Sequence, residues 1–87
     1  MEVKFKKPFT KKFDQLPKKL QAIVSSRVEL FISNPLHLQL NNHALKGKYR
    51  GFRSINITGD WRAIFRETGN YQLVTFETIG THNQLYR

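Results

Sequence analysis

Four side chains in the second half of this chain have the chemistry to cleave a phosphodiester bond. They are Asp60, Arg62, His82 and Tyr86. Metal-free cleavage of RNA needs a base for the 2′-hydroxyl proton, cations for the extra charge on the phosphate, and an acid for the departing 5′-oxygen. A histidine exchanges protons near neutral pH, and an arginine offers paired donors to phosphate oxygens. The four residues meet these needs only if the fold brings them together.

Other classes of site lack their sequence signatures. The chain has no glycine-rich phosphate loop, no HExxH motif and no GxSxG turn. Its three histidines, His37, His43 and His82, do not have the spacing of metal ligands, and cysteine is absent. We therefore expect no metal, no other cofactor and no disulfide. Neither a signal-like N-terminus nor a membrane-length apolar run is seen, so we expect a cytoplasmic protein.

The charge of the chain is strongly positive. Fifteen Lys and Arg residues against six Asp and Glu residues give a formal net charge of +9. Both halves of the chain carry an excess of cations, so the charge belongs to the whole domain. Such a field favours a polyanion or an acidic protein as partner.

Cations and aromatic rings alternate through the second half. The cations are Lys46, Lys48, Arg50, Arg53, Arg62 and Arg66. Tyr49, Phe52 and Trp61 are interleaved with them. Single-stranded RNA suits such a surface, because its phosphates need neutralising and its bases can stack on rings. A solvated sheet face with its aromatic residues in the core would show the same pattern, and the pattern alone does not separate the two.

The elements that must position these residues begin with a strand and two helices. Apolar and charged residues alternate over Glu2–Lys6, which predicts a short strand. Apolar residues recur at helical spacing from Pro8 to Leu16, and a second apolar stripe runs from Pro17 to Ser33. Asn34-Pro35 ends the second helix, because the residue before proline disfavours helical geometry. We expect a helical hairpin with one apolar face, followed by an extended connector over Leu36–Asn42.

The second half changes to the two-residue period of strands. Strands are predicted over Leu45–Tyr49, Phe52–Thr58, Trp61–Glu67 and Tyr71–Ile79. Short glycine-containing turns connect them, which implies antiparallel neighbours. The order β-α-α-β-β-β-β is an α+β fold, with an N-terminal strand and a helical hairpin packed on a small antiparallel sheet. No linker or repeat divides the chain, so we expect residues 1–87 to form one domain.

Ordered motifs in the second half resemble a known family. The segment His43–Gly47 is followed by the glycine–aromatic–arginine step Gly51–Arg53, the aspartate–tryptophan turn Asp60-Trp61, and the ending Gly80–Tyr86. This order resembles the RelE/ParE toxin superfamily of type II toxin–antitoxin systems and is most similar to its YafQ-like branch. The resemblance implies a RelE-like fold and a ribosome-dependent endoribonuclease, an mRNA interferase that cuts messenger RNA in the ribosomal A site.

The resemblance also implies which residues are catalytic. The motif histidines of the YafQ-like branch fall on His43 and His82, its turn aspartate on Asp60, and its closing aromatic residue on Tyr86. In related YoeB-like members an arginine on the strand after the turn is catalytic, and Arg62 matches it. Which of these groups is the base and which the acid stays open.

One position departs from the family pattern. A second histidine of the branch, before the aspartate–tryptophan turn, is replaced here by Asn56. An asparagine can bind phosphate or ribose but exchanges no proton at neutral pH. The full set expected to bind RNA is Lys46, Lys48, Arg50, Arg53, Asn56, Trp61 and Arg66.

Several of these residues have structural alternatives. His82 could cap the last strand, His43 could anchor the connector, and Tyr86 could only pack on the sheet. Asp60 could be an ordinary turn residue, and Trp61 could belong to the core. On the helices, Lys18, Lys19 and Arg27 are interpreted as docking charges outside the chemistry.

The resemblance implies a set of partners and leaves three functions to separate. The partners are a cognate antitoxin forming a hetero-oligomer with the chain, the ribosome with its mRNA, and operator DNA reached through the antitoxin. A ParE-like protein shares the fold but inhibits DNA gyrase without nuclease chemistry. A weakened homologue would bind its antitoxin without cutting, and Asn56 keeps that third interpretation open. Codon preference, antitoxin family and stoichiometry do not follow from the sequence.

Overall fold

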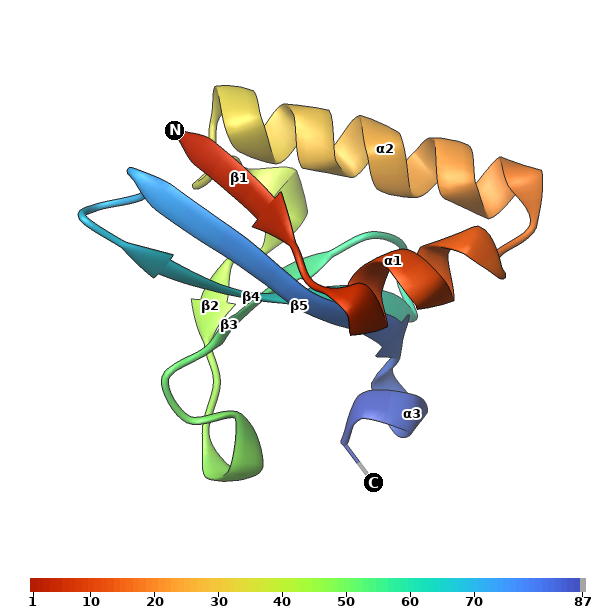
Figure 1. Ribbon diagram of the computed structural model, residues 1–87. Helices are drawn as coiled ribbons and strands as arrows, with labels where there is room; N and C mark the ends of the chain where they lie inside the picture. Colours follow the sequence, from red (N-terminus) through yellow and green to blue (C-terminus); the bar gives the residue numbers. More distant parts are fainter. Residues whose placement is uncertain (87) are drawn as a thin grey trace.

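The computed structural model describes residues 1–86 and shows helices packed on one face of a five-stranded sheet (Figure 1). Strand β1 (Glu2–Phe5) leads into α1 (Lys7–Asp14) and α2 (Lys18–Ser33). The other strands are β2 (His43–Ala44), β3 (Arg53–Asn56), β4 (Trp61–Thr68) and β5 (Leu73–Thr81). The 3₁₀ helices η1 (Leu38–Leu40) and η2 (Gly47–Tyr49) flank β2, and the short helix α3 (His82–Leu85) follows β5.

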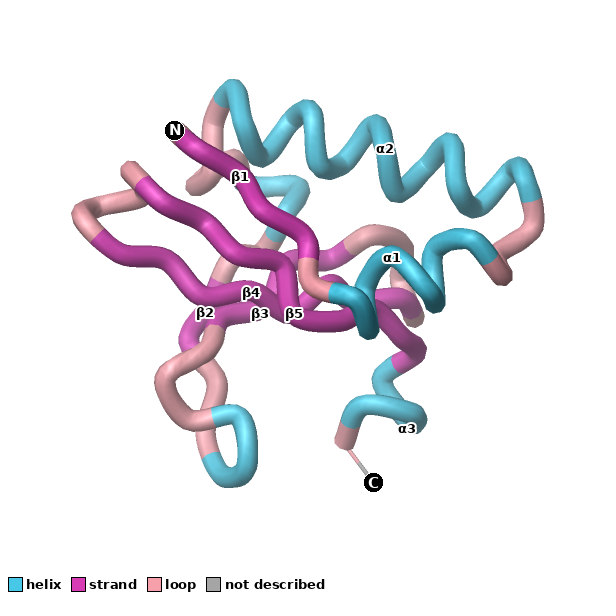
Figure 2. The backbone as a smooth tube through the Cα atoms, viewed as in Figure 1, coloured by secondary structure: helices cyan, strands magenta, loops and turns pink. Residues whose placement is uncertain are grey.

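The strands are arranged in the order β1-β5-β4-β3-β2 (Figure 2). The pairs β2–β3, β3–β4 and β4–β5 are antiparallel, so the predicted meander is confirmed. Strand β1 instead runs parallel to β5. A parallel pair needs a long connection, and here both main helices and three strands separate the two partners in sequence.

The hydrophobic core lies between the helices and the sheet. Phe31 of α2, Phe65 of β4 and Phe76 of β5 are fully buried. The ring of Phe31 lies 4.8 Å from that of Phe65 and 5.4 Å from that of Phe76, in edge-to-face geometry. Phe9 of α1 joins them, with its ring 5.5 Å from Phe76. The predicted apolar face of the helical hairpin is thus confirmed as the face that covers the sheet.

The strand predicted over Leu45–Tyr49 is not formed as such. Only His43 and Ala44 pair with β3, and the chain then turns through η2. Gly47 and Gly51 adopt φ values of +66° and +92°, which take the backbone out of the extended region. The predicted connector likewise contains a helical turn, η1. This part of the prediction failed because alternating apolar residues cannot reveal where glycines bend the chain.

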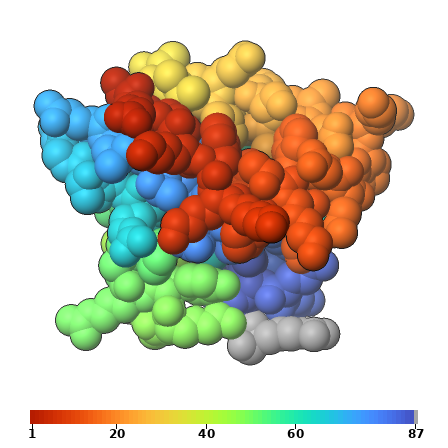
Figure 3. All heavy atoms as spheres, viewed as in Figure 1, coloured from red at the N-terminus to blue at the C-terminus, as the bar shows by residue number. Residues whose placement is uncertain are grey.

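Helix α3 was not predicted from the sequence. It begins with a capping box, in which the Gln84 backbone N–H donates to Thr81 Oγ1 at 3.2 Å and the Thr81 N–H donates to Gln84 Oε1 at 3.0 Å. In the space-filling view, the green segment around η2 and the blue C-terminal residues lie side by side at the lower edge of the molecule (Figure 3). Among residues 1–86, no helix has the length and apolar content to cross a membrane.

Candidate active site

The sheet register places several predicted site residues on the face opposite the helices. Directly paired residues of antiparallel strands point to the same side of a sheet. His43 pairs with Ser54, while Asn56 pairs with Arg62, which pairs in turn with Gly80. The residues that alternate with Ser54 and Asn56 along β3 belong to the core. His43 and Arg62 therefore share the face turned away from the helices.

A cleft of about 380 Å³ lies on this face. Its lining residues are Asn41, His43, Leu45, Arg62, His82 and Tyr86. Two imidazoles and a guanidinium from three separate parts of the chain thus border one space. Four of the five residues predicted to be catalytic line the cleft, and Asp60 is the exception.

The guanidinium of Arg62 is anchored on the turn before β4. Its Nη1 donates to the carbonyl oxygens of Thr58 at 3.0 Å and Trp61 at 3.2 Å. These bonds use one nitrogen of a head group that carries five N–H donors. The remaining donors can serve an anion in the cleft without the side chain having to be ordered first.

His82 is the first residue of α3, and the same turn holds it. Its backbone N–H donates to the carbonyl oxygen of Asp60 at 3.0 Å. Gly80 lets α3 fold back over the sheet, because a Cβ there would lie 3.1 Å from both Gln84 Oε1 and Leu85 Cδ2. The glycine and histidine of the C-terminal motif thus have linked roles. Gly80 makes room for the helix, and the helix presents His82.

His43 is oriented by a neighbouring backbone carbonyl. Its Nδ1 lies 2.7 Å from the carbonyl oxygen of Asn41. A carbonyl oxygen can only accept, so this hydrogen bond requires a proton on Nδ1. In the neutral ring the lone pair then lies on Nε2. His43 is therefore held in the tautomer that a general base needs.

A row of aromatic rings continues from the cleft to η2. The rings of His82 and Tyr86 lie 4.7 Å apart, and Tyr86 and Tyr49 lie 5.9 Å apart. Tyr49 contacts Phe52 at 6.3 Å. Burial raises the pKa of Tyr49 above its ordinary value, and Tyr86 and Glu77 add to the rise.

Two cations lie over this row. Lys48 Nζ is 5.2 Å from the centre of the Tyr49 ring, and Arg66 Cζ is 5.0 Å from that of Phe52. Cation–π contacts of this kind hold flexible side chains over a surface. Lys46 and Arg50, at the two ends of η2, are exposed. Four of the cations predicted to bind RNA therefore lie on or beside the segment that borders the cleft.

The structure does not bring Arg53 and Trp61 to the cleft. Each is adjacent in sequence to a cleft-facing residue, so strand alternation turns it to the helical side. Arg53 Nε donates to Asn42 Oδ1 at 2.8 Å, and Asn42 Nδ2 donates to the hydroxyl of Tyr71 at 3.1 Å. Trp61 packs against the core. The pairing register thus gives both residues structural partners outside the cleft, and RNA contacts for them stay a prediction.

Asp60 and Asn56 lie next to the cleft. Asp60 is exposed in the turn, and its backbone N–H donates to Thr58 Oγ1 at 3.2 Å. Asn56 is paired with Arg62 across β3 and β4, so both lie on the same sheet face. Within residues 1–86, Asn56 Oδ1 and the hydroxyl of Ser54 are buried without a hydrogen-bond partner. Neither residue lines the cleft, so these two polar groups lie beside it on the same face of the sheet.

Sequence reasoning missed two of the lining residues, Asn41 and Leu45. Asn41 acts through its backbone carbonyl, which any residue type provides, so no sequence signal identifies it. Leu45 was assigned to a strand that does not form. Among the described residues, no group of three or more His, Asp or Glu side chains could hold a metal ion.

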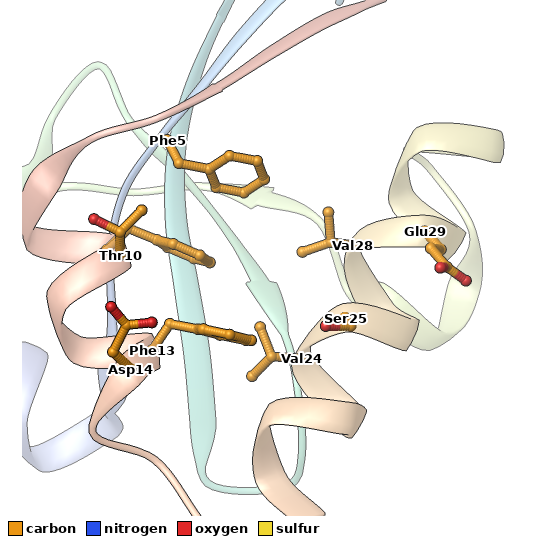
Figure 4. Close-up of a pocket in the computed structure, with 9 residues that line it drawn as sticks. Phe5, Thr10, Phe13, Asp14, Val24, Ser25, Val28 and Glu29 are labelled. Atoms are coloured by element: carbon orange, nitrogen blue, oxygen red, sulfur yellow. The ribbon is translucent and has the colours of Figure 1, made fainter. Parts of the chain in front are cut away.

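A second cavity, of about 330 Å³, lies on the helical side between α1 and α2 (Figure 4). It is lined by Phe5, Phe9, Thr10, Phe13, Asp14, Val24, Ser25, Val28 and Glu29. The close-up shows the aromatic residues opposite the two valines of α2. None of the predicted catalytic residues lies there, so the cleft on the opposite face is the candidate active site.

A helical hairpin packed on one face of a small, mainly antiparallel sheet is the RelE-like fold. A crystal structure of YafQ from Escherichia coli has the same fold, with a TM-score of 0.82 and 24% identity over 99% of this chain and 98% of that chain. Residues 1–87 match the model of a family described as the bacterial toxin of type II toxin–antitoxin systems, YafQ. The chain belongs to the YafQ toxin family.

Two further relatives are more similar in sequence. The mRNA interferase toxin YafQ of Escherichia coli (strain K12) is 36% identical over 59 residues, which are 66% of this chain. The match spans 62% of the length of that protein. The matching chain in a crystal structure of the DinJ–YafQ complex from Escherichia coli has a TM-score of 0.78 and 28% identity, covering 99% of this chain and 98% of that chain.

Proposed function

We propose that this chain is an endoribonuclease that cleaves messenger RNA. The observation that carries the proposal is the meeting of His43, Arg62 and His82 around one cleft. This set supplies the base, the cation and the acid that cleavage by a 2′-hydroxyl requires. The name of the Escherichia coli relative, an mRNA interferase, supports messenger RNA as the substrate.

His43 is the general base of the proposed mechanism. Its Nε2 takes the proton from a ribose 2′-hydroxyl, because Nδ1 is held by the Asn41 carbonyl. The 2′-oxygen then forms a bond to the adjacent phosphorus, and the bond from phosphorus to the 5′-oxygen breaks. His82 returns a proton to that oxygen, which leaves a 2′,3′-cyclic phosphate on one product and a 5′-hydroxyl on the other.

Arg62 stabilises the charge that builds up on the phosphate. Its free N–H donors bind the non-bridging oxygens while Nη1 stays on the backbone carbonyls. Tyr86 supports the ring of His82 from 4.7 Å. Asp60 holds the backbone of His82 through its carbonyl, and Asp60→Asn tests whether the carboxylate contributes as well.

The RNA strand leaves the cleft along η2 in this proposal. Lys46, Lys48, Arg50 and Arg66 neutralise phosphates there, and Tyr49 and Tyr86 offer rings to the bases. Asn56, which is paired with Arg62 on the neighbouring strand, binds ribose or phosphate. A single-stranded substrate fits this surface because its bases are free to stack.

The proposed setting is the ribosomal A site, where the ribosome positions the message against the cleft. The proposed regulator is an antitoxin that binds the chain and carries the complex to operator DNA. The complex of DinJ with YafQ supports such a partner. In the absence of ribosomes we expect the free protein to cut RNA slowly, since it must then order the substrate alone.

The test is a translation reaction to which purified protein is added, followed by mapping of new 5′ ends on the message. We expect cuts in phase with codons, lost with His82→Gln and with Arg62→Ala. Intact message together with gyrase-trapped DNA breaks would support the ParE-like alternative. Intact message, no DNA breaks and tight antitoxin binding would support a homologue that has lost activity.

A further inference from the structure

Arg27 lies on α2, on the helical side of the sheet, and does not line the cleft. Its Nε donates to the carbonyl oxygen of Ile57 at 3.2 Å, and its Nη1 donates to Gln39 Oε1 at 2.9 Å. The half-buried head group is thus bound at both ends, which does not fit the docking charge expected from the sequence. One side chain joins the end of β3 to the 3₁₀ helix η1.

The Ile57 bond reaches the turn that holds Arg62 and His82. Ile57 begins this turn, where its N–H donates to Trp61 O at 2.9 Å. The carbonyl oxygen of Thr58, the next residue, accepts from Arg62, and Asp60 O accepts from the backbone of His82. A shift of Ile57 therefore moves the turn whose carbonyl oxygens hold Arg62 and His82.

The Gln39 bond reaches the segment that holds His43. Gln39 is the middle residue of η1, and Asn41 caps that helix with a φ of 45°. The carbonyl oxygen of Asn41 binds His43 Nδ1. The orientation of the proposed base therefore depends on where η1 lies.

We propose that Arg27 is a positioning residue that sets the spacing between His43 and the Arg62–His82 pair. This inference rests on the proposed nuclease function. Strand pairing joins the segments that carry these groups, and Arg27 adds a second link between the loops that hold them. A misplacement of about 1 Å in such a site costs about 100-fold in rate. The planar fork of arginine suits two acceptors, whereas lysine offers a single point charge.

The experiment compares Arg27→Met and Arg27→Lys with Lys11→Met, which removes the same charge from an exposed position of α1. We expect kcat for RNA cleavage to fall about 100-fold in both Arg27 variants. The Kd for an uncleavable 2′-deoxy analogue should stay within about twofold, and Lys11→Met should resemble the parent. Gln39→Leu should lower kcat, because it removes the oxygen that accepts from Arg27. Gln39→Glu keeps an acceptor oxygen and should have the kcat of the parent. All assays are run well below each variant's Tm.

A loss of kcat no larger than that of Lys11→Met, or a parallel loss of RNA affinity, would overturn the proposal. If the parent protein cleaves no RNA, the proposed function fails, and the Arg27 inference is then tested on the free protein. Histidine-ring ¹⁵N spectra report the tautomer of His43. We expect one tautomer, protonated at Nδ1, in the parent and a mixture in Arg27→Met. An unchanged His43 ring would reject the positioning role.

Discussion

At the residue scale, the cleft depends on side chains that are oriented before any substrate binds. Arg62 is anchored through one nitrogen, and His43 through the nitrogen that need not react. Because backbone carbonyls orient them, the guanidinium of Arg62 and the imidazole of His43 do not have to be ordered during the reaction. Substitutions at these residues therefore test geometry as well as charge.

Replacing Arg62 by lysine keeps the charge but removes the fork. The lysine ammonium cannot bind Thr58 O and still present paired donors to a phosphate, so we predict that kcat falls about 100-fold. The measurement is single-turnover cleavage of a ribosome-bound message. Arg66→Lys is the matched control, because Arg66 lies on the same strand but outside the cleft. Equal losses in the two variants would contradict the assignment of Arg62.

The raised pKa of Tyr49 makes stability depend on alkaline pH. The folded state disfavours the phenolate form of Tyr49. The contribution of the protonated Tyr49 side chain to stability is therefore fully present below the ordinary tyrosine pKa of 10.0. It is lost as the pH rises from that value through the raised pKa, because the unfolded chain releases the proton first. We predict that the free energy of unfolding falls more between pH 9 and pH 11 in the parent than in Tyr49→Phe, as measured in urea. Parallel curves would show that Tyr49 titrates normally.

At the element scale, α3 is the piece that completes the site. Its capping box starts the helix at His82, and Gly80 lets Leu85 pack against the sheet. Four residues are too few to be stable as an isolated helix. The helix therefore persists through these tertiary contacts, and the position of His82 and Tyr86 depends on them.

Gly80→Ala should disturb the site while the rest of the fold still forms. The added Cβ would lie 3.1 Å from Leu85 Cδ2 and Gln84 Oε1, so both side chains must give way and the packing of α3 on the sheet is disturbed. We predict a loss of about 1–3 kcal/mol in the free energy of unfolding, together with loss of cleavage at temperatures where the variant is folded. Gly59→Ala is the control, since a Cβ there has nothing within 4 Å and Gly59 has no positive φ. A Gly80→Ala variant with full activity would contradict the proposed position of His82.

At the scale of the whole molecule, the net charge of +9 acts unevenly. Cations lie on or beside the η2 segment next to the cleft, while others lie on the helices. Counterion release makes RNA binding depend on salt in proportion to the number of phosphates neutralised. The number of functional cations can therefore be counted from binding curves.

We predict that log Kd for single-stranded RNA rises steeply with log salt concentration. Removing one contact, as in Lys46→Gln, should flatten the slope by about 0.7. Lys18→Gln on α2 removes the same charge from the other side of the molecule and should leave the slope unchanged. Fluorescence titrations at several salt concentrations provide the measurement. Equal effects of the two substitutions would mean that only the net charge matters.

Much of the fold followed from the sequence by itself. The periods of apolar residues predicted the helical hairpin and most of the strands, because both depend on local geometry. Motif order indicated the family and pointed to His43, and the residue types indicated the chemistry at Arg62 and His82. The sequence could not predict α3, or the two-residue β2 and the helix η2 found in place of the strand expected over Leu45–Tyr49, because short elements are stabilised by contacts with distant segments.

Only the tertiary structure decided which side chains share the cleft. Alternation places Arg53 and Trp61 one residue out of phase with the cleft-facing positions, and the register of β3 against β4 fixes which phase is which. The tertiary structure also gives Arg27 two hydrogen-bond partners, Ile57 and Gln39, and no local sequence pattern links these residues to Arg27. The sequence determined which reactive groups were available. The pairing of strands determined which of them meet, because a register is set by the packing of the whole sheet.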